Sequence, residues 1–347
     1  RGAASTLPTT FELLTLLAFL AFRLADCTTA VVEVGLGGRL DATNMVAPVV
    51  SVITAIELEH TDHLGNDIPS IAREKAGIVK PGVPVVMADQ RPEADAVITA
   101  IAAERNARLL RVSDEVSVAS QPTSDLTTHM PATLVTLRFR DGITVSTPLR
   151  LLGAVQATNA ALASLAVRTA FPDTRAEALA EGLARAWLPG RAELIRDARL
   201  GQTPLPDVLL DGAHTPESVR RVLDVARELE PLPTRRVLVF GSVAGKQHSA
   251  MLHLVAREFA SIIISRPGTF KASNVPELYE ACVAEGANCI LAPETEDALR
   301  AALASAPSLI VVTGSFHLVG QARRAIQITA DGASPEIDDT LGERRRA

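Results

Sequence analysis

The sequence is poor in cysteine, has no surplus of basic residues and contains no uninterrupted apolar run long enough to cross a bilayer. Its three cysteines, Cys27, Cys282 and Cys289, form no Cys-x-x-Cys pair, which argues against a disulfide framework or a cysteine zinc site and favours a reducing cytoplasm. A net charge of −6 and a pI near 5.7 argue against a surface that binds nucleic acid or an anionic membrane.

The most apolar segment, residues 11–26, is shorter than a membrane span and is interrupted by Glu12, Thr15 and Arg23. It predicts a buried helix. No basic start with a small-residue cleavage site precedes it, so we do not interpret it as a signal peptide. The chain begins with Arg1 in a loop and runs at once into this helix, and we therefore expect it to be the remainder of a longer chain.

Hydrophobic residues make up 47% of the 347 residues and charged residues 21%, which is typical of a globular protein of about two domains. Short β-branched runs alternate with helical patterns, as in parallel sheets with crossover helices. The strands are expected at residues 29–34, 49–55, 83–87, 207–211, 236–241, 261–265, 288–292 and 308–314.

Residues 133–147 break this rhythm, because two alternating runs flank Asp141-Gly142, the pattern of a β-hairpin. Two alanine-rich helices are expected next, at residues 153–171 and 174–188. The motif LPGRAE then precedes a fresh series of strands and helices. We therefore place a first domain at residues 1–187, a second at 188–330 and a flexible tail at 331–347.

The glycine-rich stretch VVEVGLGGRLDATN, residues 31–44, follows an apolar run, as a dinucleotide-binding loop would. Gly35 and Gly37 fit that fingerprint, but Leu40 stands where the third glycine is needed for close packing of helix and strand. A second candidate, FGSVAGKQH, is one residue short of a P-loop, and Gln247 replaces the hydroxyl residue that would hold Mg²⁺. Neither stretch is a phosphate-binding loop.

Polar residues instead gather at the ends of two apolar runs, where open α/β sheets bind ligands. Glu33 interrupts the run VVEVG, where a buried carboxylate would need a partner or a metal. The next run leads into ELEHTDHLG, which supplies Glu57, Glu59, His60, Asp62 and His63. Surface positions would explain each of these residues singly. As a set rich in oxygen ligands, they favour Mg²⁺ or Mn²⁺ over zinc.

Four motifs in order, EVGLGGRLDATN, HLGNDIPSIAREKAGIVKPGVPVV, PGRAE and LLDGAHTPES, resemble the folylpolyglutamate synthase and dihydrofolate synthase family of the Mur ligase superfamily. The resemblance spans most of the chain. It implies an α/β fold: an incomplete central ATPase domain of the Mur ligase type, with a parallel sheet plus a hairpin, followed by a Rossmann-like C-terminal ligase domain. It also implies that the glycine loop serves the pteroate and metal side of the site.

The resemblance assigns roles to single residues. Glu33 and His60 match Mg²⁺ ligands, two ions being expected, and Lys75 matches a lysine that family members carry carbamylated as a metal ligand. Arg39, Leu40 and Asp41 match the stretch that lines the pteroate pocket. Asn159, Arg191 and Asp211 match ATP contacts, and His214 lies beside Asp211; Lys75, His60 and His214 are the residues expected to act in the reaction. We also expect Glu33, His60 and Lys75 to converge in one cleft.

The implied reaction is the ATP-dependent addition of L-glutamate to reduced folates, to dihydropteroate or to both, through an acyl phosphate. A carboxylate is a poor electrophile, so it must first accept the γ-phosphoryl group of ATP before the amine of glutamate can attack it. These small molecules are the expected partners, with no nucleic acid or membrane, and we expect a monomer.

The sequence departs from the family in three places. The P-loop unit that the family carries upstream of Val31 is not found, so we expect this chain alone to be inactive. Glu59 stands where aspartate is usual before His60, and Thr215 replaces the asparagine of A-H-N-P, which puts a nucleotide contact in doubt. The alternatives are a non-catalytic folate-binding remnant, another Mur-type amide ligase or, with less support, an NAD enzyme.

Overall fold

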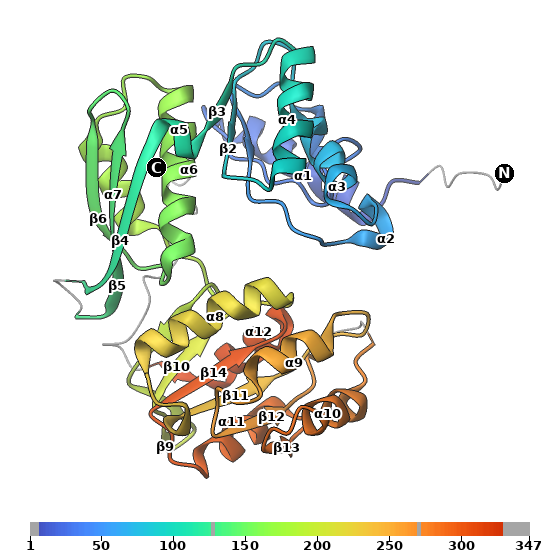
Figure 1. Cartoon of the computed structure of the whole chain (residues 1–347), viewed down its shortest axis with the longest axis vertical. Helices are drawn as coiled ribbons and strands as arrows, with labels where there is room; N and C mark the ends of the chain where they lie inside the picture. Colours follow the sequence, from blue (N-terminus) through green and yellow to red (C-terminus); the bar gives the residue numbers. More distant parts are fainter. Residues whose placement is uncertain (1–6, 126–128, 269–271, 329–347) are drawn as a thin grey trace. The chain divides into compact units, whose positions relative to one another are not determined.

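The computed structural model describes residues 7–125, 129–268 and 272–328 (Figure 1). The predicted flexible tail lies outside these residues. The chain divides into two compact units. Unit 1 comprises Arg1–Ala119, Val135–Thr147 and Ala157–Leu183, and unit 2 comprises Ser120–Leu134, Pro148–Gln156 and Ala184–Ala347.

Unit 1 contains a parallel three-stranded sheet in the order β1-β2-β3. Helices α3 and α4 lie beside it in Figure 1, and their apolar residues Ile71 and Ile98 are fully buried against strand residues such as Met87. The runs at 49–55 and 83–87 were predicted as strands, and both predictions are confirmed by β1 and β2. The elements are β1 (Ser51–Ile53), α2 (Thr61–Leu64), α3 (Ile68–Lys75), β2 (Val85–Met87), α4 (Pro92–Glu104), β3 (Leu109–Arg111) and α5 (Val112–Glu115).

The apolar segment near the start forms helix α1 (Thr10–Leu24), but the prediction that it is buried is wrong. Thr9 and Glu12 form a reciprocal capping box that fixes where the helix begins. None of its residues is buried, and Leu16 is 65% exposed. The reason is that its contact with the described residues is narrow: Phe11 packs on Gly35, where an added Cβ would lie 2.4 Å from the ring.

The predicted strand at residues 29–34 is also wrong, because no described strand pairs with it. The sheet of unit 1 has β1 at one edge, and β1 pairs only with β2. Without a hydrogen-bonding partner the segment forms no ladder, and Val31 is 96% exposed. Glu33 is exposed as well, so the argument from a buried carboxylate does not hold.

A separate three-stranded sheet, in the order β4-β5-β6, contributes residues to both units. The predicted hairpin is confirmed: Gly142 N–H donates to the carbonyl of Phe139 at 2.9 Å, closing the turn at Asp141-Gly142. Both predicted alanine-rich helices are confirmed. The elements are β4 (Val116–Ser124), β5 (Pro131–Phe139), β6 (Thr144–Leu149), α6 (Ala154–Ala170) and α7 (Ala176–Arg185).

Unit 2 is built on a six-stranded sheet in the order β13-β12-β11-β14-β10-β7, parallel except for the edge strand β7. The five predicted strands of this half are confirmed as β10 to β14. A small antiparallel sheet joins β8, β9 and β15. The strands are β7 (Glu193–Ile195), β8 (Ala198–Leu200), β9 (Thr203–Pro204), β10 (Asp207–Leu210), β11 (Arg236–Phe240), β12 (Ser261–Ile264), β13 (Cys289–Leu291), β14 (Leu309–Thr313) and β15 (Gln327–Ile328).

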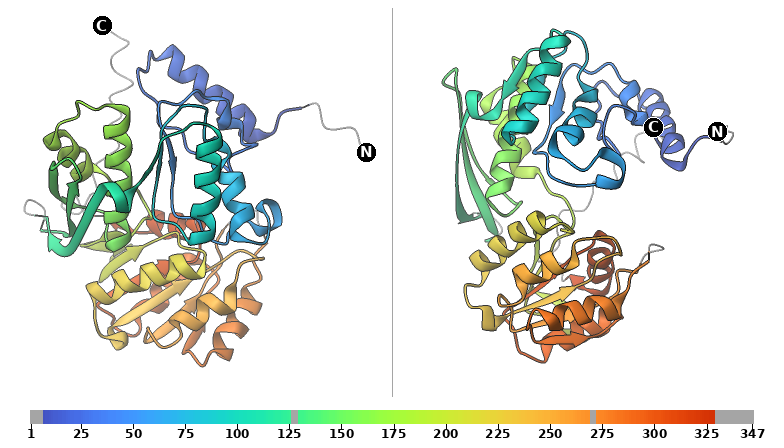
Figure 2. Two further views of the ribbon diagram at one scale, coloured as in Figure 1. Left: turned by 45° about the horizontal axis from the view of Figure 1, so that its top comes forward. Right: turned by 45° about the vertical axis from the view of Figure 1, so that its right-hand side comes forward.

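Helices cover both faces of this sheet (Figure 2). Alternate strand residues explain the arrangement: Leu209 and Leu238 pack with α8, α9 and α10, whereas Val208 and Val239 pack with α11 and α12. The four inner strands, β12, β11, β14 and β10, are largely buried on both faces, which accounts for their nearly continuous apolar sequences, whereas the edge strand β13 is only partly buried. The helices are α8 (Pro216–Leu229), α9 (His248–Val255), α10 (Val275–Ala284), α11 (Thr295–Leu303) and α12 (Phe316–Ala325).

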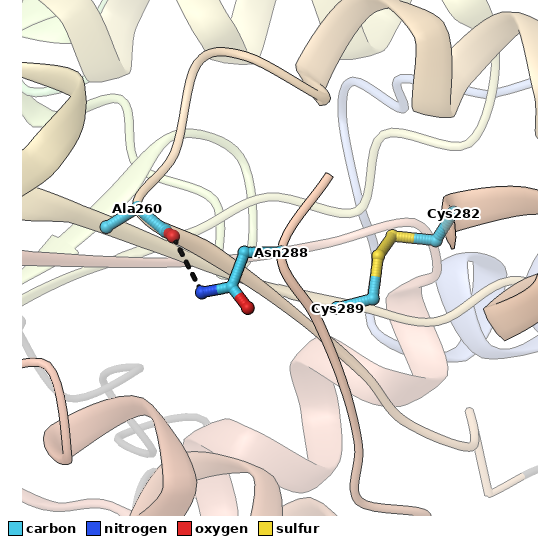
Figure 3. The surroundings of a disulfide bond; sticks show 4 residues. All are labelled: Ala260, Cys282, Asn288 and Cys289. Carbon is cyan, nitrogen blue, oxygen red and sulfur yellow. Dashed lines mark hydrogen bonds between the residues drawn. A yellow bond between two sulfur atoms is a disulfide. The ribbon is translucent and has the colours of Figure 1, made fainter. Parts of the chain in front are cut away.

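A disulfide joins Cys282 of α10 to Cys289 of β13 (Figure 3). Asn288 donates a hydrogen bond to the carbonyl of Ala260 at 3.1 Å, which holds the chain next to Cys289. The lack of a Cys-x-x-Cys pair argued against disulfide bonding, and this expectation is wrong for Cys282 and Cys289, which stand seven positions apart. Cys27 is a free thiol. Among the described residues, no helix combines the length and apolar character needed to cross a membrane.

Candidate functional site

In unit 1, the glycine-rich loop is docked on the C-terminal end of α3. Arg39 N–H donates to the carbonyl of Glu74 at 2.9 Å, and the Arg39 guanidinium pairs with the Glu74 carboxylate at 2.9 Å. An alanine Cβ at Gly77 would lie 2.3 Å from the Cβ of Arg39, so only glycine fits there. The predicted pteroate residue Arg39 is therefore fixed in place, with about half of its side chain exposed.

The other two predicted pteroate residues have different surroundings. Leu40 is 80% exposed, which leaves an apolar side chain available to a ligand. Asp41 caps a short 3-10 helix and accepts hydrogen bonds from Thr43 and from Leu36 N–H. Burial alone would raise the pKa of Asp41, but these hydrogen bonds outweigh it and hold the pKa below its usual range. Asp41 thus organises the loop.

The C-terminal part of this loop is tied to the same segment of the chain. Asn44 donates from its side chain to the carbonyls of Arg39 and Gly77, at 3.0 and 3.3 Å. Lys80 Nζ donates to the carbonyl of Asn44 at 2.6 Å. These contacts give the loop a defined shape next to Lys75, which is half-buried at the end of α3.

The predicted metal residues lie in three segments of unit 1: Glu33 at the start of the glycine-rich loop, His60 directly before α2, and Lys75 at the end of α3. His60 has a left-handed backbone, with φ of 54°, and its Nε2 lies 3.6 Å from a carboxylate oxygen of Glu59. Within the described part of the chain, no group of three or more His, Cys, Asp or Glu residues could hold a metal ion. The convergence of Glu33, His60 and Lys75 stays a prediction.

In unit 2, the motif PGRAE forms a tight turn before β7. Gly190 and Ala192 both have positive φ, 67° and 46°. Gly190 N–H donates to the buried carboxylate of Glu193 at 2.9 Å, and Arg323 Nε donates to the other oxygen of that carboxylate at 3.0 Å. Arg191 is exposed at this turn. Glu193 and Arg323 were not predicted, although a carboxylate inside an apolar strand was the signal already used for Glu33.

Asp211 follows β10 and joins this turn to the next loop. It is 9% exposed, and its two oxygens accept N–H groups from Ala192 and Ala213, both at 2.8 Å. Burial raises the pKa of Asp211, while these hydrogen bonds and the positive charges of Arg191 and His214 offset part of the rise. Two loops far apart in sequence therefore depend on one carboxylate.

His214 lies in the same loop. Its Nδ1 is 2.9 Å from the carbonyl of Gly212, and because a carbonyl oxygen can only accept, Nδ1 donates this hydrogen bond. Thr215, the departure from the family pattern, begins α8 with a reciprocal capping box to Ser218. Thr215 is therefore the N-cap of α8, a position that asparagine also favours. Asn159 is exposed on α6 in unit 1.

Profiles of two protein families match the chain one after the other. Residues 2–167 match the Mur ligase middle domain, and residues 190–316 match the Mur ligase glutamate ligase domain. The folylpolyglutamate synthase of Lacticaseibacillus casei is 34% identical over 325 residues, covering 92% of this chain and 71% of that protein. The chain belongs to the Mur ligase family, in its folylpolyglutamate synthase and dihydrofolate synthase branch.

Other relatives agree with this assignment. The dihydrofolate synthase/folylpolyglutamate synthase of Escherichia coli is 32% identical, over 93% of this chain and 71% of that protein. A probable bifunctional folylpolyglutamate synthase/dihydropteroate synthase of Halobacterium salinarum is 35% identical, but the chain spans only 41% of it. The relatives of this chain are ATP-dependent folate ligases.

Solved structures of the family have the same fold. Mycobacterium tuberculosis folylpolyglutamate synthase, complexed with ADP and AMPPCP, has a TM-score of 0.81 at 30% identity, covering 95% of this chain and 74% of that one. Escherichia coli FolC, in complex with DHPP and ADP, has a TM-score of 0.77 at 30% identity, covering 91% and 70%. The predicted fold class is confirmed.

Proposed function

We propose that this chain is an ATP-dependent ligase that joins L-glutamate to reduced folates, to dihydropteroate or to both. The observation that carries this proposal is the loop cluster of unit 2, in which Asp211 holds the turn that presents Arg191 and the loop that presents His214. Relatives of this fold bind ADP, AMPPCP and DHPP.

The reaction has two steps. A carboxylate oxygen of the acceptor attacks the γ-phosphorus of ATP, which releases ADP and forms an acyl phosphate. The amine of L-glutamate then attacks the acyl carbon, loses a proton and expels inorganic phosphate, so an amide bond forms. Positive charge near the phosphates lowers the barrier of the first step, and an exposed guanidinium such as that of Arg191 supplies it.

We assign Arg191, Asp211 and Asn159 to ATP, with Asp211 acting through the loops it ties together. We assign Arg39, Leu40 and Asp41 to the pteroate end of the acceptor, where the exposed Leu40 offers an apolar surface and Asp41 keeps the loop in shape. We assign His214, which lies in the loop that Asp211 holds, to accept a proton in the second step.

The metal assignment is Glu33 and His60, with Lys75 as a carbamylated ligand and two Mg²⁺ ions in all. Mg²⁺ binds through one or two protein carboxylates together with waters and substrate phosphates, so the assignment requires no dedicated protein cage. The bound ion would neutralise charge on the transferring phosphoryl group. Lys75 is half-buried beside the docked glycine loop, where a carbamate would place an anion.

The test is ADP release measured with ATP, Mg²⁺, L-glutamate and either dihydropteroate or tetrahydrofolate, on the 347-residue chain and on the chain extended by its upstream reading frame. Arg191→Gln should raise the KM for ATP about tenfold or more, the loss expected for one charged contact of roughly 1.5–3 kcal/mol. Arg196→Gln is the control, because Arg196 already pairs with Asp207. Folate binding without ADP release by either form would indicate a non-catalytic remnant.

A further inference from the structure

We propose that Phe316 is a positioning residue for ATP binding, which holds the guanidinium of Arg191 in its working place. This inference rests on the proposed function and adds to it a residue that is not among the assigned ligands. Phe316 begins α12, directly after the N-cap Ser315 at the end of β14. Arg191 and His214 reach it from two other loops.

Phe316 contacts both loops through its ring. The Cζ atom of Arg191 lies 4.5 Å from the ring centroid, a cation–π geometry. The imidazole of His214 lies edge-on, with 6.4 Å between the ring centroids and 61° between the planes. A cation–π contact uses the face of the guanidinium and none of its in-plane N–H donors. Phe316 can therefore orient Arg191 while those donors bind phosphate.

The chain makes room for this ring at Gly212. A Cβ at Gly212 would lie 2.3 Å from a Phe316 ring atom, although Gly212 has no positive φ that would itself require glycine. The glycine next to Asp211 is thus explained by the ring. At Gly190 an added Cβ would reach the ring at 3.8 Å. The ring fills the space between the two loops.

Phe316 is not part of the hydrophobic core. It is 40% exposed, whereas α12 contributes Leu318, Val319 and Ala322 to the buried cluster on its side of the sheet. An aromatic ring that is left partly exposed against an arginine serves orientation more than burial. An unrestrained arginine would lose more side-chain freedom when it binds phosphate, and a ring that restrains it beforehand lowers that cost.

The test compares variants in the form of the chain that releases ADP in the assay above, with the KM for ATP and kcat measured separately. Phe316→Leu should raise the KM for ATP about 2- to 30-fold, the range of a cation–π contact, and leave kcat within about twofold. Phe316→Tyr should restore the wild-type KM because it keeps the ring. In an Arg191→Gln background, Phe316→Leu should add nothing.

The matched control is Phe259→Leu, which removes the cation–π contact with Arg236 in the same unit. Arg236 begins β11, so this contact lies at the N-terminal ends of the parallel strands, whereas Phe316 follows the C-terminal end of β14. Thermal unfolding of each variant shows whether it folds, and Phe316→Met replaces Phe316→Leu if the latter does not. NMR of the arginine side chains of the 347-residue chain gives a readout independent of turnover. The ring-current shift of Arg191 should disappear in Phe316→Leu and in Phe316→Met, and it should persist in Phe316→Tyr.

The outcomes separate the two proposals. If Arg191→Gln raises the KM for ATP and the Phe316 variants do not, the inference is overturned and the proposed function stands. If Arg191→Gln has no effect, the ATP contact itself is wrong and the inference falls with it. If Phe259→Leu raises the KM for ATP as much as Phe316→Leu does, the rise reflects a general loss of stability, and the positioning role is overturned.

Discussion

Replacing Asp211 with asparagine tests the part of the site on which the other assignments depend. The carboxylate accepts two backbone N–H groups at 2.8 Å, from Ala192 and Ala213, in a position that is 9% exposed. Asparagine can accept one of them, and its NH₂ group then faces the other donor. Ala192 also has a φ of 46°, so a lost hydrogen bond would release a strained turn.

The expected cost follows from these contacts. Losing one charge-assisted hydrogen bond costs roughly 1.5–3 kcal/mol, and relief of the buried charge returns part of it. We expect the free energy of unfolding of Asp211→Asn to fall by about 1–3 kcal/mol in urea titrations at pH 7, with a raised KM for ATP. The control is Asp207→Asn in the same strand, whose exposed pair with Arg196 should contribute less than about 1 kcal/mol.

The pH dependence of stability gives a second readout of the same substitution. Because burial raises the pKa of Asp211 above its unfolded value, the folded state binds the proton more tightly than the unfolded state. Wild-type stability should therefore decline, relative to Asp211→Asn, as pH rises from about 4 through the folded pKa. Equal stability of Asp211→Asn and Asp207→Asn, with parallel pH profiles, would refute the reasoning.

Two further predictions concern packing and the disulfide. Gly77→Ala should destabilise the chain by about 1–3 kcal/mol, because its Cβ would lie 2.3 Å from that of Arg39. Gly182→Ala, which has open space around it in a helix, should be neutral or stabilising. A loss of stability in both variants would contradict the packing argument. Reduction of Cys282–Cys289, seven positions apart, should cost about 2.5 kcal/mol by loop entropy, and a Cys282→Ser variant should not respond to reductant; an unchanged urea midpoint in reduced wild type would count against the crosslink.

The sequence predicted β10, β11, β12 and β14 well because each is an apolar run that is largely buried on both faces of the sheet. It missed β3, β7, β8, β9 and β15, which are two or three residues long, and also the nine-residue β4, whose residues are mostly exposed. It also mistook apolar character for burial in α1. Hydrophobicity indicates which face of a helix is apolar, but whether another element covers that face depends on the tertiary structure.

The sequence predicted those residues of the candidate site that lie in recognisable motifs. Arg191, Asp211 and His214 were identified by resemblance, and the structure links their loops through Asp211. Phe316 was missed because it lies more than a hundred residues from Arg191 in sequence, and the contact depends on how β10 and β14 pair in one sheet. No local pattern encodes such a pairing.

The central claim is that the acceptor carboxylate is activated as an acyl phosphate before glutamate attacks it. We would supply dihydropteroate labelled with ¹⁸O in its carboxylate, together with ATP, Mg²⁺ and L-glutamate, to the form of the chain that releases ADP. The account predicts one ¹⁸O atom in the inorganic phosphate for each amide bond formed, and none when L-glutamate or the acceptor is omitted. Amide formation with unlabelled phosphate would contradict it.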